Sequence, residues 1–227
     1  DDSPLDRFKQ ALTGASRALA EEPEVEVAWS ADSPTQSGTN FRVPLPGRSL
    51  PADQAREARG FADSFALRLR LHDEAVHGAN APPEPVARAC YDAIEQVRYE
   101  ALGANNYSGI RSNLVAAVEL RTASDPIARA QVANDVPLQT ALSLILREQL
   151  TGQPVPDRAQ KGVGMVRDWV EERIGSDFES LALSLDNQED FQSLALDILR
   201  NLDLTRPEDT DSSDEEDEDG EDEDSPE

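Results

Sequence analysis

A helical repeat of apolar residues in the middle of the chain is the feature that most constrains its fold. From residue 86 to residue 101 the apolar side chains recur at i, i+3, i+4, i+7, i+8, i+11 and i+15, the spacing of one face of an α-helix. A second helical pattern continues to Leu120. The sequence therefore predicts two consecutive helices between Glu84 and Leu120. The apolar face of the first helix carries Val86, Ala89, Cys90, Ala93, Ile94, Val97 and Ala101, and its polar face carries Glu84, Arg88, Asp92, Glu95 and Gln96.

Residues 103–111 predict a loop between these two helices. Gly103 is a residue type that often ends a helix, and Ser108 is a favourable cap for the next one. Loops between helices commonly carry recognition residues, so we expect this loop to contact a partner protein. The alternative is structural: the asparagines close a turn, the tyrosine fills the core, and the arginine pairs with Glu100 or Glu119. The candidate partner-binding residues are Asn105, Asn106, Tyr107 and Arg111.

The rest of the chain shows the same helical spacing, with one β element. Helices are expected at about 5–20, 51–76, 137–150, 157–174 and 189–202, and a short one after Asp125-Pro126. Asp157 with Gln160, and Asp186 with Glu189, resemble capping boxes. Residues 25–29 and 41–45 alternate in polarity and predict a β-hairpin that packs on helices. We expect a mainly α fold of about eight helices with one small β-hairpin near the N-terminus, about residues 25–46.

Acidic residues outnumber basic ones. The 227 residues contain 46 Asp or Glu against 21 Lys or Arg, a formal net charge of −25. Residues 207–227 hold 14 of these acids and no Lys or Arg, a composition typical of disorder. We therefore expect a helical N-terminal domain over residues 1–206 and a disordered acidic linker over residues 207–227. Proteins bind the phosphate backbone of nucleic acids through Lys and Arg. Because this chain is acidic, nucleic acid is not an expected partner.

The short apolar runs, the N-terminal composition and the cysteine content favour a cytoplasmic protein without a membrane partner. The apolar runs are too short for a transmembrane helix, and the N-terminus lacks the basic flank and apolar core of a signal peptide. The single Cys90 cannot form an internal disulfide, which fits a reducing compartment. It lies on the apolar face of its helix, so we expect a core residue and not a nucleophile.

The two histidines are the candidate metal ligands. His72 and His77 are five residues apart, about 140° around a helix, whereas paired zinc ligands on a helix are usually four residues apart. We expect solvated histidines at a helix end and no metal site. The alternative is a metal or cobalt site that uses His72, His77 and acidic residues nearby, such as Asp73 and Glu74.

Motifs for nucleotide chemistry are missing from the sequence. It contains neither G-x-x-x-x-G-K followed by Ser or Thr nor G-x-G-x-x-G, and its lysines are Lys9 and Lys161 alone. A D-x-S-x-S motif is also missing, because residues 211–215 depart from it at the last position. We therefore expect no catalytic residue in this chain, and we expect Trp29 and Trp169 to lie in the core.

Three long segments carry a resemblance to a known family. ADSFALRL (62–69), RYEALGANNYSGIRSNL (98–114) and LTGQPVPDRAQKG (150–162) resemble the T subunit family (CobT) of the aerobic, ATP-dependent cobaltochelatase. The resemblance covers roughly residues 1–206. The family also has an acidic linker and a C-terminal von Willebrand A-type domain with a metal-ion-dependent adhesion site. That domain lies beyond the 227 residues, so none of its metal ligands can be placed here.

The resemblance implies a reaction, cofactors and partners. The family's enzyme is a ligase that forms nitrogen–metal bonds, and it inserts Co²⁺ into hydrogenobyrinic acid a,c-diamide in aerobic cobalamin biosynthesis, using ATP and Mg²⁺. A large N subunit (CobN) holds the corrinoid and the metal, and an AAA+ S subunit (CobS) hydrolyses ATP. This chain is then expected to be a non-catalytic subunit that binds no cofactor itself. Its expected role is assembly and coupling, because a partner transmits work only by preferring one state of the ATPase.

Two other classes of function stay open at this point. The first is a stand-alone metal-binding or metal-delivery domain that uses His72, His77 and acidic groups, which a stoichiometric, sub-micromolar Co²⁺ site would support. The second is an acidic chaperone-like adaptor for several clients. Selective binding to the AAA+ subunit would argue against the adaptor.

Overall fold

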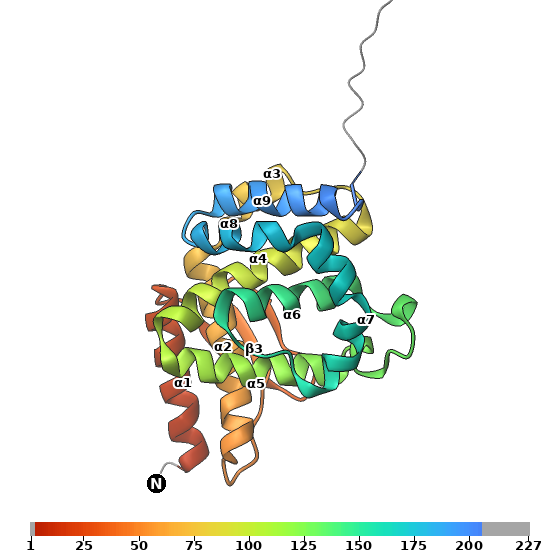
Figure 1. The fold of residues 1–227 in the computed structure, drawn as a ribbon. Helices are drawn as coiled ribbons and strands as arrows, with labels where there is room; N and C mark the ends of the chain where they lie inside the picture. Colours follow the sequence, from red (N-terminus) through yellow and green to blue (C-terminus); the bar gives the residue numbers. More distant parts are fainter. Residues whose placement is uncertain (1–2, 206–227) are drawn as a thin grey trace, which may run out of the picture.

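The computed structural model describes residues 3–205, and their fold is mainly α-helical with a small sheet near the N-terminus, as predicted (Figure 1). The predicted disordered linker, residues 207–227, lies outside the described residues. The first half contains α1 (Pro4–Ala20), β1 (Glu26–Ser30), β2 (Thr35–Ser37), β3 (Asn40–Pro44), α2 (Ala52–Leu71), α3 (Glu74–Ala79), α4 (Pro85–Asn106) and α5 (Ser108–Ser124). The second half contains the 3₁₀ turns η1 (Pro126–Arg129), η2 (Ala133–Asp135) and η3 (Gly175–Asp177), with α6 (Leu138–Thr151), α7 (Asp157–Ile174), α8 (Phe178–Leu183) and α9 (Gln188–Asn201).

Helix α4 lies in the middle of the molecule. In Figure 1, α9, α4, α6 and α5 cross the view one below another, and α1 and α2 run steeply at the lower left. α4 contacts α2, α5, α6 and α9. A helix with so many neighbours buries residues around most of its circumference. Glu95, which was predicted on the polar face, is accordingly only 5% exposed, so this part of the prediction is wrong.

Two main apolar clusters fill the interior. One joins α1, α2 and the sheet, where the rings of Phe41 and Phe65 meet at a centroid distance of 5.5 Å. The other joins α4 with α6, α7, α8 and α9, and Cys90 lies fully buried in it, as predicted. Trp29 and Trp169 pack against the edges of these clusters and keep part of their surface exposed.

The sheet has three strands, and its topology differs from the predicted hairpin. β1 pairs with β3 in parallel, with Trp29 opposite Val43, and β2 pairs with β3 antiparallel. The hairpin is therefore β2–β3. Its turn contains Gly38, whose φ of +57° is costly for residues with a Cβ. Residues 35–37, which lie between the two predicted strands, supply the extra strand β2, and β1 takes the remaining edge of β3.

The helix predicted over residues 51–76 ends early. α2 stops at Leu71, and His72 is its C-cap with an extended backbone. Asp73 then caps α3, because its side chain accepts hydrogen bonds from Ala75 N at 2.8 Å and Val76 N at 3.0 Å. The two histidines therefore lie on different elements, whereas the predicted helix held both near its end.

Other helix ends confirm one predicted cap and correct two. Asp125 Oδ1 accepts from Ile127 N at 2.9 Å and caps η1, as predicted. The cap of α9 is Asn187, whose side chain accepts from Asp190 N, and not Asp186. Asp157 is the first residue of α7 and follows the N-cap Pro156, so it forms no capping box.

Gly103 is a packing residue and not the predicted helix stop. α4 continues through it to Asn106. A Cβ on Gly103 would lie 2.5 Å from Leu67 Cδ1 and 3.3 Å from Ile110 Cγ2. The glycine therefore allows α2 and α5 to approach α4 closely. Within residues 3–205, every helix is too short or too polar to cross a bilayer.

Gly60→Ala should destabilise the fold by opening the contact between α2 and α5. A Cβ on Gly60 would lie 2.1 Å from the carbonyl oxygen of Asn113, so the two helices would have to separate. We expect the free energy of unfolding, measured with urea, to fall by ~2–3 kcal/mol. Gly14→Ala is the matched control, because a Cβ there meets nothing within 4 Å, and it should be neutral or stabilising by up to ~1 kcal/mol. Equal effects of the two substitutions would contradict the close crossing.

Candidate functional site

The predicted partner-binding residues lie at the junction of α4 and α5. α4 runs through Asn106 and α5 begins at Ser108, so Tyr107 alone separates the two helices. Its backbone is extended (φ −136°, ψ 111°). Its N–H donates to Gly103 O at 3.0 Å, and its carbonyl accepts from Arg111 N at 3.0 Å. Tyr107 therefore occupies the N-cap position that was predicted for Ser108, and no extended loop separates the helices.

Asn105 and Arg111 hold the end of α6. Asn105 Nδ2 donates to Leu150 O at 3.1 Å, and Arg111 Nη2 donates to Thr151 O. These carbonyls belong to the last turn of α6, where they have no partner within the helix. The positive charge of a guanidinium at that end also interacts favourably with the helix dipole. The structure thus brings two of the four predicted residues together and gives each of them a structural contact.

Tyr107 offers the largest exposed side chain of the four. Its relative exposure is 51%. Asn106 is exposed beside it, and its Nδ2 donates to Leu102 O in its own helix at 2.8 Å. Both residues line a surface hollow together with Leu19 and Arg70. An exposed tyrosine with a hydroxyl at its tip is a residue type enriched at protein interfaces.

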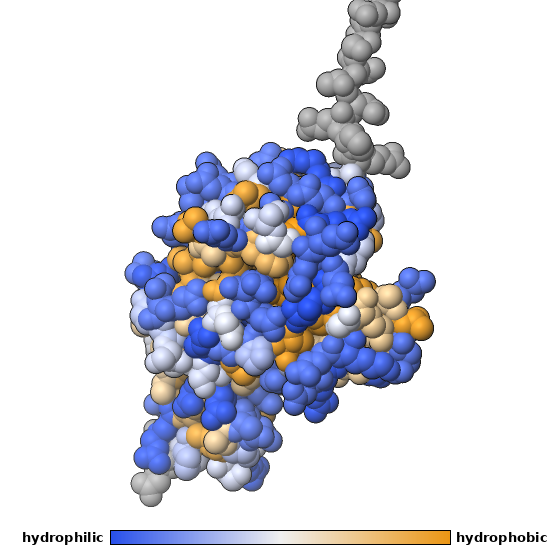
Figure 2. Space-filling model, viewed as in Figure 1, coloured by the Kyte–Doolittle hydropathy of each residue, from blue (hydrophilic) through white to orange (hydrophobic). Residues whose placement is uncertain are grey.

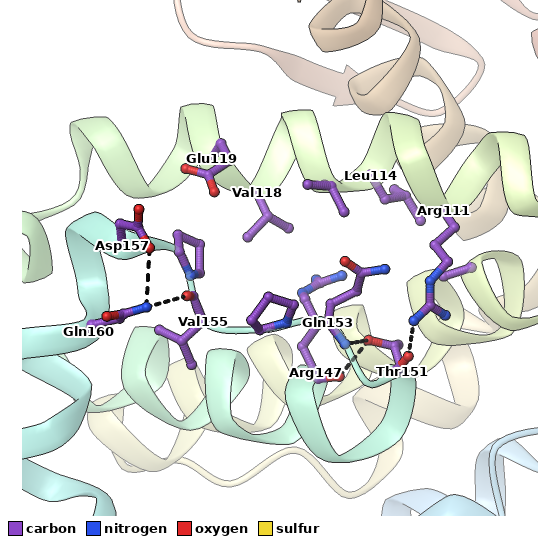
Figure 3. Close-up of a pocket in the computed structure, with 14 residues that line it drawn as sticks. Arg111, Leu114, Val118, Glu119, Arg147, Thr151, Gln153, Val155, Asp157 and Gln160 are labelled. Atoms are coloured by element: carbon purple, nitrogen blue, oxygen red, sulfur yellow. Dashed lines mark hydrogen bonds between the residues drawn. The ribbon is translucent and has the colours of Figure 1, made fainter.

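A groove lies beside Arg111, between α5, the end of α6 and the start of α7 (Figure 3). Figure 2 shows hydrophobic side chains exposed in the middle of this face, where Figure 1 places α5, α6 and α7. Pro154 and Pro156 fix the backbone of one wall. We call this the α5–α7 groove. The residues that line it are Ala104, Arg111, Leu114, Val115, Val118, Glu119, Arg147, Thr151, Gln153, Pro154, Val155, Pro156, Asp157 and Gln160.

The α5–α7 groove combines an apolar floor with polar ends. Arg111 and Gln153 lie at one end, and Asp157 and Gln160 lie at the other (Figure 3). Gln160 Nε2 donates to Asp157 Oδ1 at 3.2 Å. This distribution is typical of a binding site in which apolar contact gives affinity and a few polar groups fix orientation. The lining residues include neither His nor Cys.

A buried carboxylate lies behind the groove. Glu100 of α4 is fully buried, and its carboxylate accepts hydrogen bonds from side chains of three other helices. Ser64 Oγ of α2 donates to its Oε1 at 2.5 Å, and Arg121 Nη2 of α5 donates to the same oxygen at 2.8 Å. Arg147 Nη2 of α6 donates to its Oε2. We call these four residues the Glu100 cluster.

Charge compensation decides the protonation state of Glu100. Burial alone would raise the pKa of this carboxyl, but the charges of Arg121 and Arg147 outweigh burial and lower the pKa to about 2. Glu100 is therefore ionised at neutral pH. The same attraction raises the pKa of Arg121 against its own desolvation. The charge-assisted hydrogen bonds of two arginines to one buried carboxylate link α4, α5 and α6 strongly.

The Glu100 cluster was not predicted from the sequence. One feature of the sequence points to it: Glu100 has Gln96 and Ala104 at helical distance i−4 and i+4, so it has no basic neighbour on its own helix at those positions. An acid so placed beside the apolar face needs a partner from another element. Which arginines supply that partner is a matter of tertiary packing.

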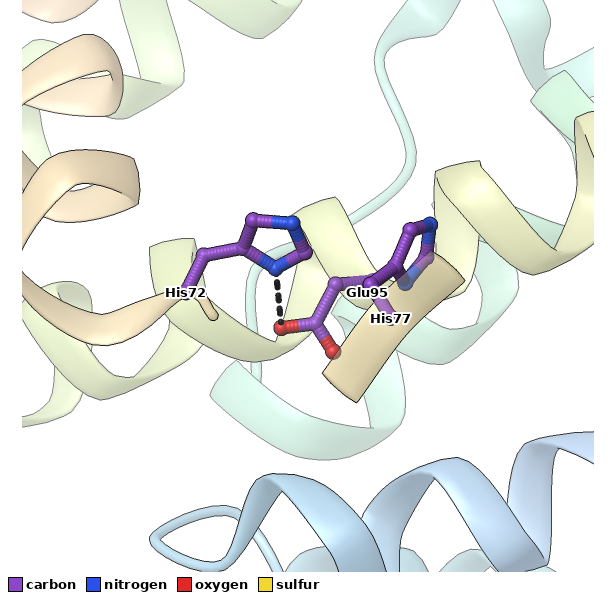
Figure 4. A group of neighbouring side chains, drawn as sticks. All are labelled: His72, His77 and Glu95. Carbon is purple, nitrogen blue, oxygen red and sulfur yellow. Dashed lines mark ion pairs between the residues drawn. The ribbon is translucent and has the colours of Figure 1, made fainter. Parts of the chain in front are cut away.

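The two histidines meet at the start of α3 (Figure 4). Their ring centroids are 4.9 Å apart. Both side chains are buried, 3% exposed for His72 and 9% for His77, whereas solvated histidines were expected. Glu95 of α4 completes the group, since one ligand atom from each of the three residues lies within 4.8 Å of the others. Sequence spacing did not reveal Glu95 as their neighbour.

Cys90 offers no reactive thiol. Its side chain is fully buried, and burial raises the pKa of the thiol to about 11. A thiol with so high a pKa is almost entirely protonated at neutral pH and is a poor nucleophile. The prediction of a small core residue is confirmed.

Glu100→Gln should cost stability in a pH-dependent way. The folded pKa lies below the ordinary value of 4.5, so the stabilisation is present above about pH 4.5 and is lost as pH falls towards 2. At pH 7 we expect urea denaturation to show a loss of ~3 kcal/mol or more, because the buried Arg147 and the partly buried Arg121 lose their counter-charge. The loss should shrink near pH 3. The control Glu172→Gln, at an exposed acid on α7, should change stability by less than ~0.5 kcal/mol. A loss that is equal at both pH values would contradict the charge argument.

Comparison with known proteins places the chain in a family. A family model described as "Cobalamin biosynthesis protein CobT" matches residues 2–227, and no solved structure matches the chain. The three resembling segments meet in the structure: Ser64 of the first bonds Glu100 of the second, and Arg111 of the second bonds Thr151 of the third. The match covers nearly the whole sequence, and the chain therefore belongs to the CobT family of cobalamin biosynthesis proteins.

Proposed function

We propose that this chain is the assembly and coupling subunit of a cobaltochelatase, the ATP-dependent ligase that inserts Co²⁺ into hydrogenobyrinic acid a,c-diamide. Membership in a cobalamin biosynthesis family supports this reading. The sequence has no P-loop, so in this proposal ATP hydrolysis belongs to the AAA+ subunit (CobS), and the large subunit (CobN) holds the corrinoid. The proposed setting is the cytoplasm, which suits a free, buried cysteine.

The observation that carries the docking role is the position of Tyr107. It is a half-exposed aromatic residue on a one-residue junction between the two central helices. Its own backbone bonds join α4 to α5. Buried aromatic anchors dominate binding energy at many interfaces, and they work best when the backbone that holds them is fixed. A partner that covers Tyr107 would therefore bind a preorganised surface.

The α5–α7 groove extends this surface in the direction of Arg111. Arg111 lines the groove and is the fourth residue after Tyr107, on the first turns of α5. The apolar floor and the polar ends of the groove provide contact area and orientation next to the aromatic anchor. We propose that one partner segment contacts Tyr107 and enters the groove.

Coupling requires that the docked partner prefer one nucleotide state. A subunit that binds the ATP-loaded and the ADP-loaded ring equally well transmits nothing, however tightly it binds. A tenfold difference in affinity corresponds to ~1.4 kcal/mol and is enough to detect. In this proposal the Glu100 cluster keeps α4, α5 and α6 in fixed positions, so that force applied at Tyr107 moves the helices as a unit.

Tyr107→Ala should weaken the complex with the AAA+ subunit. Size-exclusion chromatography with light scattering, with and without ATP, measures the complex, and titration gives its dissociation constant. We expect a nucleotide-dependent complex and at least ~10-fold weaker binding of the variant, because an exposed anchor is lost while the fold is kept. Circular dichroism and thermal denaturation verify the fold.

Leu183→Ala is the matched control, because Leu183 is an exposed apolar residue on another element, α8, and is 78% exposed. It should bind as the native chain does. A complex that both variants weaken equally, or that Tyr107→Ala leaves unchanged, would move the docking surface away from the α4–α5 junction. The lack of any complex at micromolar concentration would overturn the docking role of this chain.

A further inference from the structure

We propose that His72, His77 and Glu95 form a binding site for one divalent transition-metal ion of the Zn²⁺ or Co²⁺ class. Two imidazoles and one carboxylate are a ligand set that such ions favour, and three protein ligands leave a fourth position for water or another ligand. The site is a property of this chain alone. It does not depend on the proposed docking role, and the two are tested by different measurements.

The three side chains converge from separate elements. His72 follows the end of α2, His77 lies on α3, and Glu95 lies on α4. His72 Nδ1 is 3.2 Å from Glu95 Oε1, and Figure 4 shows one ring nitrogen of His77 facing the same carboxylate. The three ligand atoms lie within 4.8 Å of one another. Small side-chain rotations would bring all three within about 2.0–2.2 Å of a common centre, the bond lengths of zinc to nitrogen and oxygen.

Each imidazole also faces a second carboxylate through its outer nitrogen. His77 Nε2 is 2.8 Å from Asp92 Oδ1, and His72 Nε2 is 3.5 Å from Glu74 Oε2. When His77 Nε2–H donates to Asp92, the Nδ1 lone pair of His77 is left free to bind a metal. At His72, Gln188 Nε2 lies 3.4 Å from Nδ1, and a metal would replace this contact. This arrangement recurs around metal-binding histidines, where the outer carboxylate fixes the tautomer and makes the ligand more basic.

Arg98 fixes the third ligand and limits which ion fits. Its Nε donates to both oxygens of Glu95, at 2.7 and 3.1 Å, and its other nitrogens donate to Leu71 O at 2.6 Å and Leu185 O at 3.0 Å. Each carboxylate oxygen has two lone pairs, so Glu95 can bind a metal while it accepts from Arg98. The nearby positive charge disfavours ions held mainly by electrostatic attraction, such as Mg²⁺ and Ca²⁺. It therefore selects ions that bond strongly to imidazole.

The site has a route to solvent. Glu74 is two-thirds exposed while it contacts His72, and Asp92 is half exposed while it contacts His77. Asp73 and Gln188, next to His72, line an open surface hollow between α3 and the start of α9. A buried ligand set with exposed outer carboxylates suits a metal that enters and leaves.

Metal titration of the whole 227-residue chain tests the proposal. The chain is stripped of metal and titrated with Co²⁺ by calorimetry and by visible absorption, in excess Mg²⁺ to occupy weak acidic sites. We expect one Co²⁺ per chain with a sub-micromolar dissociation constant and a spectrum typical of imidazole ligands. Zn²⁺ should displace it.

Variants assign the site. His72→Gln and His77→Gln should each weaken binding by at least ~100-fold, and Asp92→Asn, which removes an outer carboxylate, by ~10–100-fold. Asp168→Asn, at an exposed acid on α7, is the matched control and should bind as the native chain does. If a histidine variant fails to fold by circular dichroism, the half-exposed Asp92 decides the matter. Native affinity in Asp92→Asn or in a folded histidine variant, or no stoichiometric Co²⁺ or Zn²⁺ binding by the native chain, would overturn the proposal.

Discussion

The ionised carboxylate of Glu100 is the interaction on which the arrangement of the helices depends. A buried charge is costly unless it is paired and hydrogen-bonded, and Glu100 meets that requirement only when α2, α5 and α6 are all in place around α4. Apolar packing alone tolerates small shifts of one helix along another. A carboxylate held by two guanidinium groups and a hydroxyl does not, so the cluster specifies one register for the four helices.

That fixed register determines which residues are available to a partner. Asn105 and Arg111 look like recognition residues in the sequence, yet both bond carbonyls at the end of α6. Tyr107 lies between them with half its surface exposed. Asn105 and Arg111 thus stabilise the junction, and Tyr107 is the residue that the junction exposes to a partner. The Glu100 cluster joins α5 and α6 to α4, and each of these two helices forms a wall of the groove beside Tyr107.

Two buried carboxylates on α4 have opposite surroundings. Glu100 faces two arginines, which satisfy its charge. Glu95 faces one arginine and two imidazoles, and each imidazole has its outer nitrogen near another acid. The first environment is complete without a ligand, because the carboxylate has all the donors it can use. The second brings one nitrogen or oxygen ligand atom from each of three side chains within 4.8 Å of the others. This difference, and not the mere presence of histidine, separates a structural cluster from a candidate metal site.

The sequence by itself determined the local structure. Apolar spacing along residues 86–101 fixed α4 and its buried Cys90, and similar spacing placed most other helices, because a helix face is set by residues three and four apart. Only the tertiary structure decided what lies across from each face. It made Gly103 a contact for Leu67 and not a helix end, paired β1 with β3 in parallel, and buried Glu95 beside two histidines five residues apart. These outcomes depend on contacts between residues distant in sequence, which no local periodicity records.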